Sequence, residues 1–278
     1  MIALGLAGYP LGHSLSPRIH AAALTSCGLE GSYSLFPIRP EDMDVLKNLI
    51  EHVREGAIVG LNVTIPHKQN VIQFLDTLTP TAKAIGAVNT VYVRDRKLIG
   101  DNTDAPGFLS DLKKFLATGR RRLGELNALV LGAGGSARAV IYALVNDGWK
   151  VTIAARRSEQ ARQLAAYFRK ASVGVSDLQT FQPSNLQLIV NTTPIGMSPN
   201  VDQSPWPENL PFPPGAVIYD LVYNPRQTKL VRDACLQGLY ATTGLGMLVE
   251  QAALSFELWT GCHPPREALF KAASQTTH

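Results

Sequence analysis

Cysteine is scarce in this chain. Only three occur, Cys27, Cys235 and Cys262, and they are far apart in the sequence. An odd number at such spacings indicates no disulfide framework, and no two of them have the spacing of paired metal ligands. We therefore expect no bound metal, and a reducing cytoplasm is the predicted location.

Long hydrophobic runs and long basic runs are also missing. No segment approaches the length that a membrane-spanning helix needs. The apolar beginning, MIALGLAG, has no positively charged region and no cleavage site, so we expect a first buried strand there rather than a signal peptide. The net charge is +4, but the longest basic run, Arg120 to Arg122, is short and has no interleaved aromatic residues. Nucleic acid is therefore not an expected partner.

What the chain does contain is typical of a folded protein of ordinary size. Its 278 residues are 45% hydrophobic and 17% charged, which excludes a disordered chain and suffices for two domains. From residue 1 to about residue 104, strand-like segments (2–8, 32–38 and 57–64) alternate with helix-like segments (16–28, 41–55 and 67–75). This alternation predicts an open, mostly parallel α/β sheet covered by helices.

The rest of the sequence predicts a second α/β unit. Residues 86–100 read as two antiparallel strands joined by a polar turn, and residues 104–119 read as a connecting helix. Residues 128–157 then follow the order strand, glycine turn, helix, strand, and residues 186–194 and 216–223 are strand-like. The proline-rich stretch 198–215 is expected to be a loop, and 247–261 a strong amphipathic helix.

The glycine turn has the spacing of a dinucleotide-binding motif. In GAGGSA, Gly132 would occupy the tight turn, Gly134 would let the backbone approach a pyrophosphate, and Ala137 would allow close packing of the helix on the strand. Such turns are also common as purely structural features. Here the flanking strand, helix and next strand are all expected, so dinucleotide binding is the favoured interpretation.

The end of the next strand decides between the two nicotinamide dinucleotides. An NAD site normally has an acidic residue there to bind the ribose hydroxyls. This strand instead ends in Ala155, Arg156 and Arg157. Two guanidinium groups would pair with the 2′-phosphate of NADP, although a solvated basic turn is the alternative. NADP is the predicted cofactor.

Polar residues also gather where the expected strands of the first half end. Ser14 and Ser16 follow the first strand and would suit a small carboxylate ligand, although Ser16 before Pro17 also reads as a helix cap. Four further residues lie where strand-like runs meet turns or helices: Thr64, Lys68, Asn89 and Asp104. Ligands of open α/β sheets bind at such strand ends, and a cation with a carboxylate can transfer protons. Each residue also has a structural explanation as a cap, a turn or a surface residue, and His13 and His67 are expected to be structural.

Nearly the whole sequence resembles the shikimate dehydrogenase family. The resemblance rests on GHSLSP, NVTIPHK, GAVNTV, DNTDAPGF, GAGGSARA, NTTPIGM, DLVYNPRQT and GLGMLVEQAALSFELWTG, which occur in the family's order. Members of the family reduce 3-dehydroshikimate to shikimate with NADPH in chorismate and aromatic amino-acid biosynthesis. The resemblance implies a discontinuous substrate-binding domain (1–104 and 245–278), a Rossmann-type NADP-binding domain (105–244), and a cleft between them.

The resemblance also implies roles for individual residues. Lys68 and Asp104 would be the catalytic pair. The substrate would be bound by Ser14, Ser16, Thr64, Asn89, Tyr223 and Gln251. The cofactor would be held by Gly132, Ala133, Gly134, Gly135, Ser136, Arg156 and Arg157, with Leu221 and Gly244 near the nicotinamide. The family usually has Asn-Arg-Thr where this chain has Ala155-Arg156-Arg157, so one amide contact is lost and one cation is gained.

Lys68 is expected in the first turn of a helix, where the macrodipole is unfavourable to a cation. Burial and the dipole would favour the neutral amine, whereas a nearby Asp104 would favour the ammonium form, so that Lys68 could pass a proton near neutral pH. Three alternatives are weighed. One is a quinate/shikimate dehydrogenase of broader substrate range that uses NAD or NADP, and another is a non-catalytic NADP- or shikimate-binding module. The third, a different two-domain dehydrogenase such as one acting on folates, would explain GAGGSA but not the motifs of the first half. A monomer or a homodimer is expected.

Overall fold

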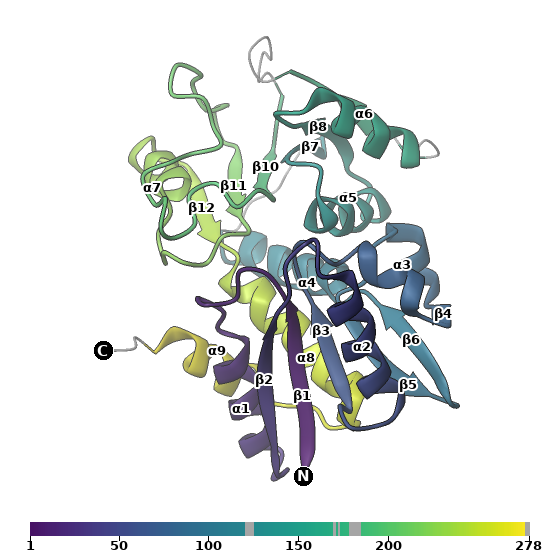
Figure 1. Ribbon diagram of the computed structural model, residues 1–278. Helices are drawn as coiled ribbons and strands as arrows, with labels where there is room; N and C mark the ends of the chain where they lie inside the picture. Colours follow the sequence, from purple (N-terminus) through teal and green to yellow (C-terminus); the bar gives the residue numbers. More distant parts are fainter. Residues whose placement is uncertain (120–124, 169–170, 172, 178–184, 276–278) are drawn as a thin grey trace. The chain divides into compact units, whose positions relative to one another are not determined.

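The computed structural model of the chain describes residues 1–119, 125–168, 171, 173–177 and 185–275 (Figure 1). These residues form two compact units. Unit 1 comprises Met1–Gly107 and Leu248–His278, and unit 2 comprises Phe108–Met247. The chain crosses between them within helices α4 (Asp104–Thr118) and α8 (Leu245–Thr260). The predicted boundaries, 104/105 and 244/245, lie at the beginnings of the same two helices, and the basic run at 120–122 lies outside the described residues.

Unit 1 is built on one six-stranded sheet in the order β2-β1-β3-β5-β6-β4. Its strands are β1 (Ile2–Gly8), β2 (Gly31–Pro37), β3 (Gly60–Val63), β4 (Thr77–Leu78), β5 (Thr90–Arg94) and β6 (Lys97–Asp101). Its helices, apart from α4 and α8, are α1 (Ser16–Ser26), α2 (Met43–Arg54), α3 (Pro80–Ile85), α9 (Arg266–Ser274) and the 3₁₀ helix η1 (Asn70–Phe74).

The pairing of the strands in this sheet matches the predicted open, mostly parallel α/β sheet. Strand β1 runs parallel to β2 and β3, whereas β5 is antiparallel to both β3 and β6. The predicted hairpin of β5 and β6 is confirmed, and its two central residues, Asp95 and Arg96, have φ of 51° and 60°. Positive φ at both central residues is what a tight two-residue hairpin turn requires. Helix α2 packs on the sheet through Leu46, Leu49, Ile50 and Val53, which repeat at helical spacing.

The predicted helix over residues 67–75 is wrong. After β3 the chain makes a tight turn at a cis Ile65–Pro66 bond, in which the His67 N–H donates to the Thr64 carbonyl at 2.8 Å. Only Asn70–Phe74 is helical, as a five-residue 3₁₀ helix. The Lys68 carbonyl accepts the N–H of Val88 at 2.7 Å, so it takes no part in an α-helical ladder. Lys68 therefore precedes a short helix with little dipole, and the expected unfavourable helix terminus is absent.

Unit 2 contains a fully parallel sheet of six strands in the order β12-β11-β10-β7-β8-β9. Its strands are β7 (Asn127–Leu131), β8 (Lys150–Ala154), β9 (Val173–Val175), β10 (Leu188–Asn191), β11 (Val217–Asp220) and β12 (Tyr240–Thr243). Its helices, apart from the shared α4 and α8, are α5 (Gly135–Asn146), α6 (Ser158–Tyr167) and α7 (Lys229–Leu236). Read from β9, this is the 3-2-1-4-5-6 order of a Rossmann fold, as predicted, with the switch point between β7 and β10.

The stretch 198–215 contains no helix or strand, as its prolines predict, yet it belongs to the core of unit 2. Trp206 and Phe212 are buried there and stack with ring centroids 5.1 Å apart. They pack with Leu129, Ile189 and Ile218 of three adjacent strands. The loop therefore closes one face of the sheet with large aromatic side chains.

Candidate active site

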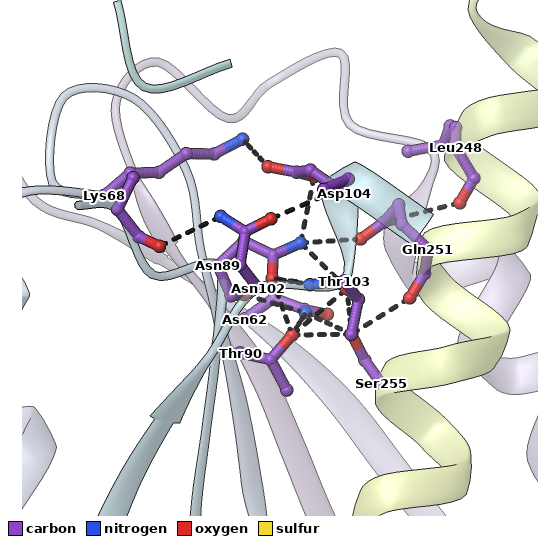
Figure 2. Close-up of polar contacts among 12 residues, drawn as sticks. Asn62, Lys68, Asn89, Thr90, Asn102, Thr103, Asp104, Leu248, Gln251 and Ser255 are labelled. Atoms are coloured by element: carbon purple, nitrogen blue, oxygen red, sulfur yellow. Dashed lines mark hydrogen bonds and ion pairs between the residues drawn. The ribbon is translucent and has the colours of Figure 1, made fainter. Parts of the chain in front are cut away.

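Lys68 and Asp104 form a buried ion pair in unit 1 (Figure 2). The Lys68 Nζ lies 2.6 Å from Asp104 Oδ2, and the two residues are 8% and 4% exposed. Lys68 follows the turn after β3, and Asp104 begins α4 just after β6. Because two strand ends supply the two charges, the pair lies at the edge of the sheet where ligands of α/β proteins usually bind.

Asn89, immediately before β5, connects this pair to α8. Its Nδ2 lies 2.9 Å from Asp104 Oδ1, 2.9 Å from Thr103 Oγ1 and 3.3 Å from Gln251 Oε1. A carboxamide nitrogen has two hydrogens, so three acceptors compete for them. The contact to Gln251 is the longest, and it is the one that an incoming ligand could replace at least cost.

The side chain that caps the first turn of α4 is that of Asn102, not that of Asp104. The Ala105 N–H donates to Asn102 Oδ1 at 3.2 Å, while the other end of the Asn102 amide donates to the Ala87 carbonyl. Asp104 is the first residue of that helix, and its carboxylate is directed at Lys68 and Asn89. The structural explanation of Asp104 as a helix cap is therefore wrong. The Asn102 side chain caps the helix, and the Asp104 carboxylate is free to bond to Lys68 and Asn89.

The two serines after β1 lie at the beginning of α1. Ser16 is the first helical residue and not the predicted cap, because the capping position is taken by Leu15. Ser14 Oγ accepts the Ser16 N–H at 3.2 Å, so the Ser14 hydroxyl ties the turn to the helix terminus. Ser14 is half-buried and Ser16 is buried.

The remaining predicted residues are divided between the units. Thr64, half-buried, follows β3 in unit 1, whereas Tyr223 follows β11 in unit 2. His67 is buried with its Nε2 2.9 Å from the Ile38 carbonyl, and His13 is exposed. The bonding of His67 agrees with its expected structural role.

The glycine turn of unit 2 connects β7 to α5 at the switch point of the sheet. Gly132 has φ of +112°, and a Cβ on it would lie 2.6 Å from Thr192 Oγ1. Gly134 is the N-cap of α5, and a Cβ there would meet no described atom within 4 Å. Ala137 is completely buried against the sheet. The turn therefore leaves open space at a helix N-terminus, which fits the pyrophosphate of a dinucleotide.

The two arginines that follow β8, Arg156 and Arg157, are both exposed, and neither forms an ion pair with another described residue. Arg157 is the N-cap of α6. Gly244 approaches the backbone of Leu221 so closely that a Cβ on it would lie 2.3 Å from the Leu221 carbonyl oxygen. Leu221 and Gly244, both predicted near the nicotinamide, are therefore neighbours.

Sequence reasoning missed four buried polar residues around Asn89. They are Asn62 of β3, Thr90 of β5, Thr103 before α4 and Ser255 of α8. All four lie inside motifs quoted above: Asn62 in NVTIPHK, Thr90 in GAVNTV, Thr103 in DNTDAPGF and Ser255 in GLGMLVEQAALSFELWTG. The motifs therefore contained a signal for each, but no pattern of adjacent residues showed that these side chains bond to one another. No group of three or more potential metal ligands occurs among the described residues.

Known families match three segments of the chain. Residues 6–91 match the shikimate dehydrogenase substrate binding domain, 116–193 the shikimate / quinate 5-dehydrogenase family, and 244–272 the shikimate 5'-dehydrogenase C-terminal domain. The shikimate dehydrogenase (NADP(+)) of Bacillus subtilis (strain 168) is 40% identical over 270 residues, or 95% of this chain and 94% of that protein.

Solved structures with the same fold cover nearly the whole chain. The shikimate 5-dehydrogenase of Thermus thermophilus, in complex with NADP(H) and shikimate, is 41% identical with a TM-score of 0.86, and 98% of each chain is covered. The quinate dehydrogenase of Corynebacterium glutamicum, in complex with NAD, is 30% identical with a TM-score of 0.86 and the same coverage of both chains. None of the described helices is long and apolar enough to cross a bilayer.

Proposed function

Because the chain belongs to the shikimate dehydrogenase family, we propose that it catalyses the reversible, NADP-dependent reduction of 3-dehydroshikimate to shikimate, with Lys68 and Asp104 as the acid–base pair. This is an oxidoreductase reaction of chorismate and aromatic amino-acid biosynthesis. The observation that carries the catalytic assignment is the buried contact of 2.6 Å between the Lys68 ammonium and the Asp104 carboxylate.

When bound, NADPH supplies the hydride that adds to the carbonyl carbon of the substrate. The Lys68 ammonium stabilises the negative charge that develops on the carbonyl oxygen and donates a proton to it. In the oxidative direction the neutral Lys68 amine removes the hydroxyl proton. Asp104 orients Lys68 and accepts a hydrogen bond from a neighbouring substrate hydroxyl.

The substrate would be held by neutral hydrogen-bonding groups around this pair. Ser14 and Ser16, in the turn at the beginning of α1, would bind the carboxylate. The hydroxyls and the rest of the carboxylate region would contact Thr64, Asn89, Tyr223 and Gln251. The Asn89 amide supports this assignment, because its three acceptors leave one contact that a substrate hydroxyl can replace.

The cofactor would be held mainly by backbone. The turn of Gly132, Ala133, Gly134, Gly135 and Ser136 would bind the pyrophosphate at the N-terminus of α5. Arg156 and Arg157 would pair with the 2′-phosphate, which is the group that distinguishes NADP from NAD. Leu221 and Gly244 would line the nicotinamide side.

The first experiment is shikimate oxidation followed by the absorbance of the reduced nicotinamide, with NADP and NAD in parallel. Quinate is the second substrate, because the similarity to an NAD-bound quinate dehydrogenase makes broader specificity the second candidate. The expected result is that shikimate is oxidised with NADP but not with NAD, and that quinate is not oxidised with either cofactor. Comparable rates with quinate or NAD would favour the broader enzyme, and a folded protein that binds NADP but turns over neither substrate would favour a binding module.

The expected setting is that of a small-molecule enzyme. We propose a cytoplasmic location, a monomeric or homodimeric state, and no nucleic-acid or membrane partner. Sedimentation of the purified chain across a concentration series would decide the oligomeric state.

A further inference from the structure

Thr90 and Ser255 have no role in the proposed chemistry, yet they are completely buried beside Asn89 (Figure 2). With two neighbours they form a compact group of polar side chains, here called the support cluster. Its members are Asn62, Thr90, Thr103 and Ser255. Buried hydroxyls and amides cost stability unless each is hydrogen-bonded, so the cluster can be checked donor by donor.

The hydroxyl of Ser255 is at the centre of the support cluster. Its oxygen lies 2.8 Å from Thr90 Oγ1, 3.0 Å from Thr103 Oγ1, 3.0 Å from Asn62 Nδ2 and 3.0 Å from the Gln251 carbonyl. The Ser255 hydroxyl has one proton, which faces two acceptors, the Gln251 carbonyl and the closer Thr90 Oγ1, and is shared between them. The two lone pairs of the Ser255 oxygen can then accept the side-chain N–H of Asn62 and the hydroxyl proton of one threonine. These bonds use the full hydrogen-bonding capacity of a hydroxyl.

Thr90 makes the corresponding contact on the Asn89 side. Its hydroxyl donates to Asn89 Oδ1 at 2.9 Å, and the Thr103 N–H donates to the same oxygen at 2.8 Å. The Thr103 hydroxyl accepts from Asn89 Nδ2 and is then able to donate to Ser255. With these directions every donor of the support cluster has an acceptor.

The consequence is a defined orientation of the Asn89 amide. Donors hold its oxygen on one side, so its nitrogen faces the two pure acceptors on the other, Asp104 Oδ1 and Gln251 Oε1. Asp104 is thereby held at both oxygens, by Asn89 at Oδ1 and by Lys68 at Oδ2. A loosened Asn89 would release one of these two restraints.

We infer that Thr90 and Ser255 are positioning residues, which hold the Asn89 carboxamide so that its N–H groups face Asp104 and the substrate. This inference rests on the proposed function, because Asn89 matters only if a substrate hydroxyl replaces one of its contacts. Ser255 also donates to the backbone of Gln251, one turn earlier in α8. It therefore couples the two proposed substrate contacts, Asn89 and Gln251.

Two pairs of variants test the inference. Thr90→Val removes the hydroxyl with little change of shape, and Thr90→Ser restores it. Ser255→Ala removes the central hydroxyl. Its matched control is Ser26→Ala on α1, since Ser26 also donates to a helix carbonyl, that of Ala23, but belongs to neither the support cluster nor the proposed site. Thermal unfolding of all four variants shows whether each is folded at the assay temperature.

Two readouts are used. For shikimate, kcat/KM should fall about tenfold in Thr90→Val and in Ser255→Ala, the effect of one net hydrogen bond, while the KM for NADP stays within about twofold. Thr90→Ser and Ser26→Ala should stay within about twofold of the parent. In ¹⁵N-labelled protein, the Asn89 side-chain amide protons, identified by their absence in Asn89→Asp, should exchange faster with solvent in Thr90→Val and Ser255→Ala.

The inference is overturned if both hydroxyl deletions keep kcat/KM and the Asn89 exchange rates of the parent. It is also overturned if Thr90→Ser fails to restore activity, or if the KM for NADP rises as much as that for shikimate. Failure of the proposed function looks different, because the parent chain then turns over no shikimate. In that case the exchange of the Asn89 amide still decides whether Thr90 and Ser255 hold it.

Discussion

Units 1 and 2 build their polar sites from different materials. In unit 1 the site consists of buried side chains that bond to one another, with Lys68, Asn89 and Asp104 all less than a tenth exposed. In unit 2 it consists of a backbone turn at Gly132–Gly135 and the arginines that follow β8. Side chains can recognise the hydroxyl pattern of one small molecule, whereas backbone N–H groups suit any pyrophosphate. Under the proposed function, the choice between NADP and NAD would then depend on the arginines.

This difference predicts how strongly substitutions in each unit should affect function. A buried network loses function when one member is removed, because the remaining groups are left without partners. A solvent-exposed arginine is screened and contributes less. Substitutions should therefore have large effects on chemistry in unit 1, and smaller effects on cofactor affinity in unit 2.

The largest effect is expected at Lys68. Lys68→Met keeps the length of the side chain but removes the proton donor and leaves Asp104 buried without its cation, so kcat should fall by about 10³-fold with a modest change of KM. The measurement is shikimate oxidation with NADP at saturation. Lys47→Met, on an exposed position of α2, is the control. Near-normal turnover of Lys68→Met would refute the acid–base assignment.

Two glycines of the turn in unit 2 should respond differently to alanine. Gly132→Ala forces a Cβ against Thr192 at a φ of +112°. The free energy of unfolding, measured by thermal unfolding, should therefore fall by about 2 kcal/mol. Gly134→Ala places its Cβ in open space, so stability should be nearly unchanged while the KM for NADP rises about tenfold.

Equal stability and equal NADP affinity in these two variants would contradict the assigned roles. The comparison is internally controlled, because both substitutions add one methyl group to the same turn. The test therefore separates a glycine needed for backbone conformation from one needed for ligand approach.

Acid should act on the two units in opposite directions. Burial lowers the pKa of His20 in unit 1 to about 3, with its ring stacked on Tyr33, and burial raises the pKa of Asp220 in unit 2 to about 6. Between pH 6.5 and 3 the unfolded state of unit 1 binds the proton at His20 and folded unit 1 does not, so falling pH favours unfolding. Between pH 6 and 3.8 folded unit 2 binds the proton at Asp220 first, so falling pH favours folding.

Hydrogen exchange at pH 7 and pH 5, corrected for intrinsic rates, measures this contrast. The opening free energy of β1 and β3 should fall by about 2 kcal/mol between pH 7 and pH 5, since each pH unit carries about 1.4 kcal/mol. That of β10 and β11 should rise by about 1 kcal/mol over the same interval. His20→Phe should flatten the response of unit 1 and Asp220→Asn that of unit 2. Equal pH slopes in both variants and the parent would rule out these two residues as the source.

The smallest effect is expected at Arg157. Arg157→Ala should weaken NADP binding by about 1–2 kcal/mol, the scale of a charge-assisted hydrogen bond, and leave NAD binding unchanged. Arg156→Ala should cost at least as much, because the resemblance assigns the retained family contact to Arg156. Isothermal titration with NADP and NAD at low and high salt is the measurement, and an equal loss for both cofactors would exclude a role in 2′-phosphate recognition.

Local sequence determined the features whose causes are local. The glycine turn, the hairpin of β5 and β6 and the proline-rich loop follow from the backbone preferences of a few adjacent residues, and all three were predicted. Strand ends rich in polar residues pointed to Lys68, Asn89 and Asp104. The ordered motifs of the family then added Gln251 and Tyr223.

Only the tertiary structure decided what depends on distant partners. The carbonyl of Lys68 bonds to Val88, which stops the expected helix and leaves Lys68 on a turn. Asn89 meets Gln251 across 162 residues, and Asn62 meets Ser255 across 193. Such contacts leave no local pattern, because a single serine among the apolar residues of a helix does not show in the sequence which groups its hydroxyl will meet. Its function depends on the groups that the fold brings within hydrogen-bonding distance of it.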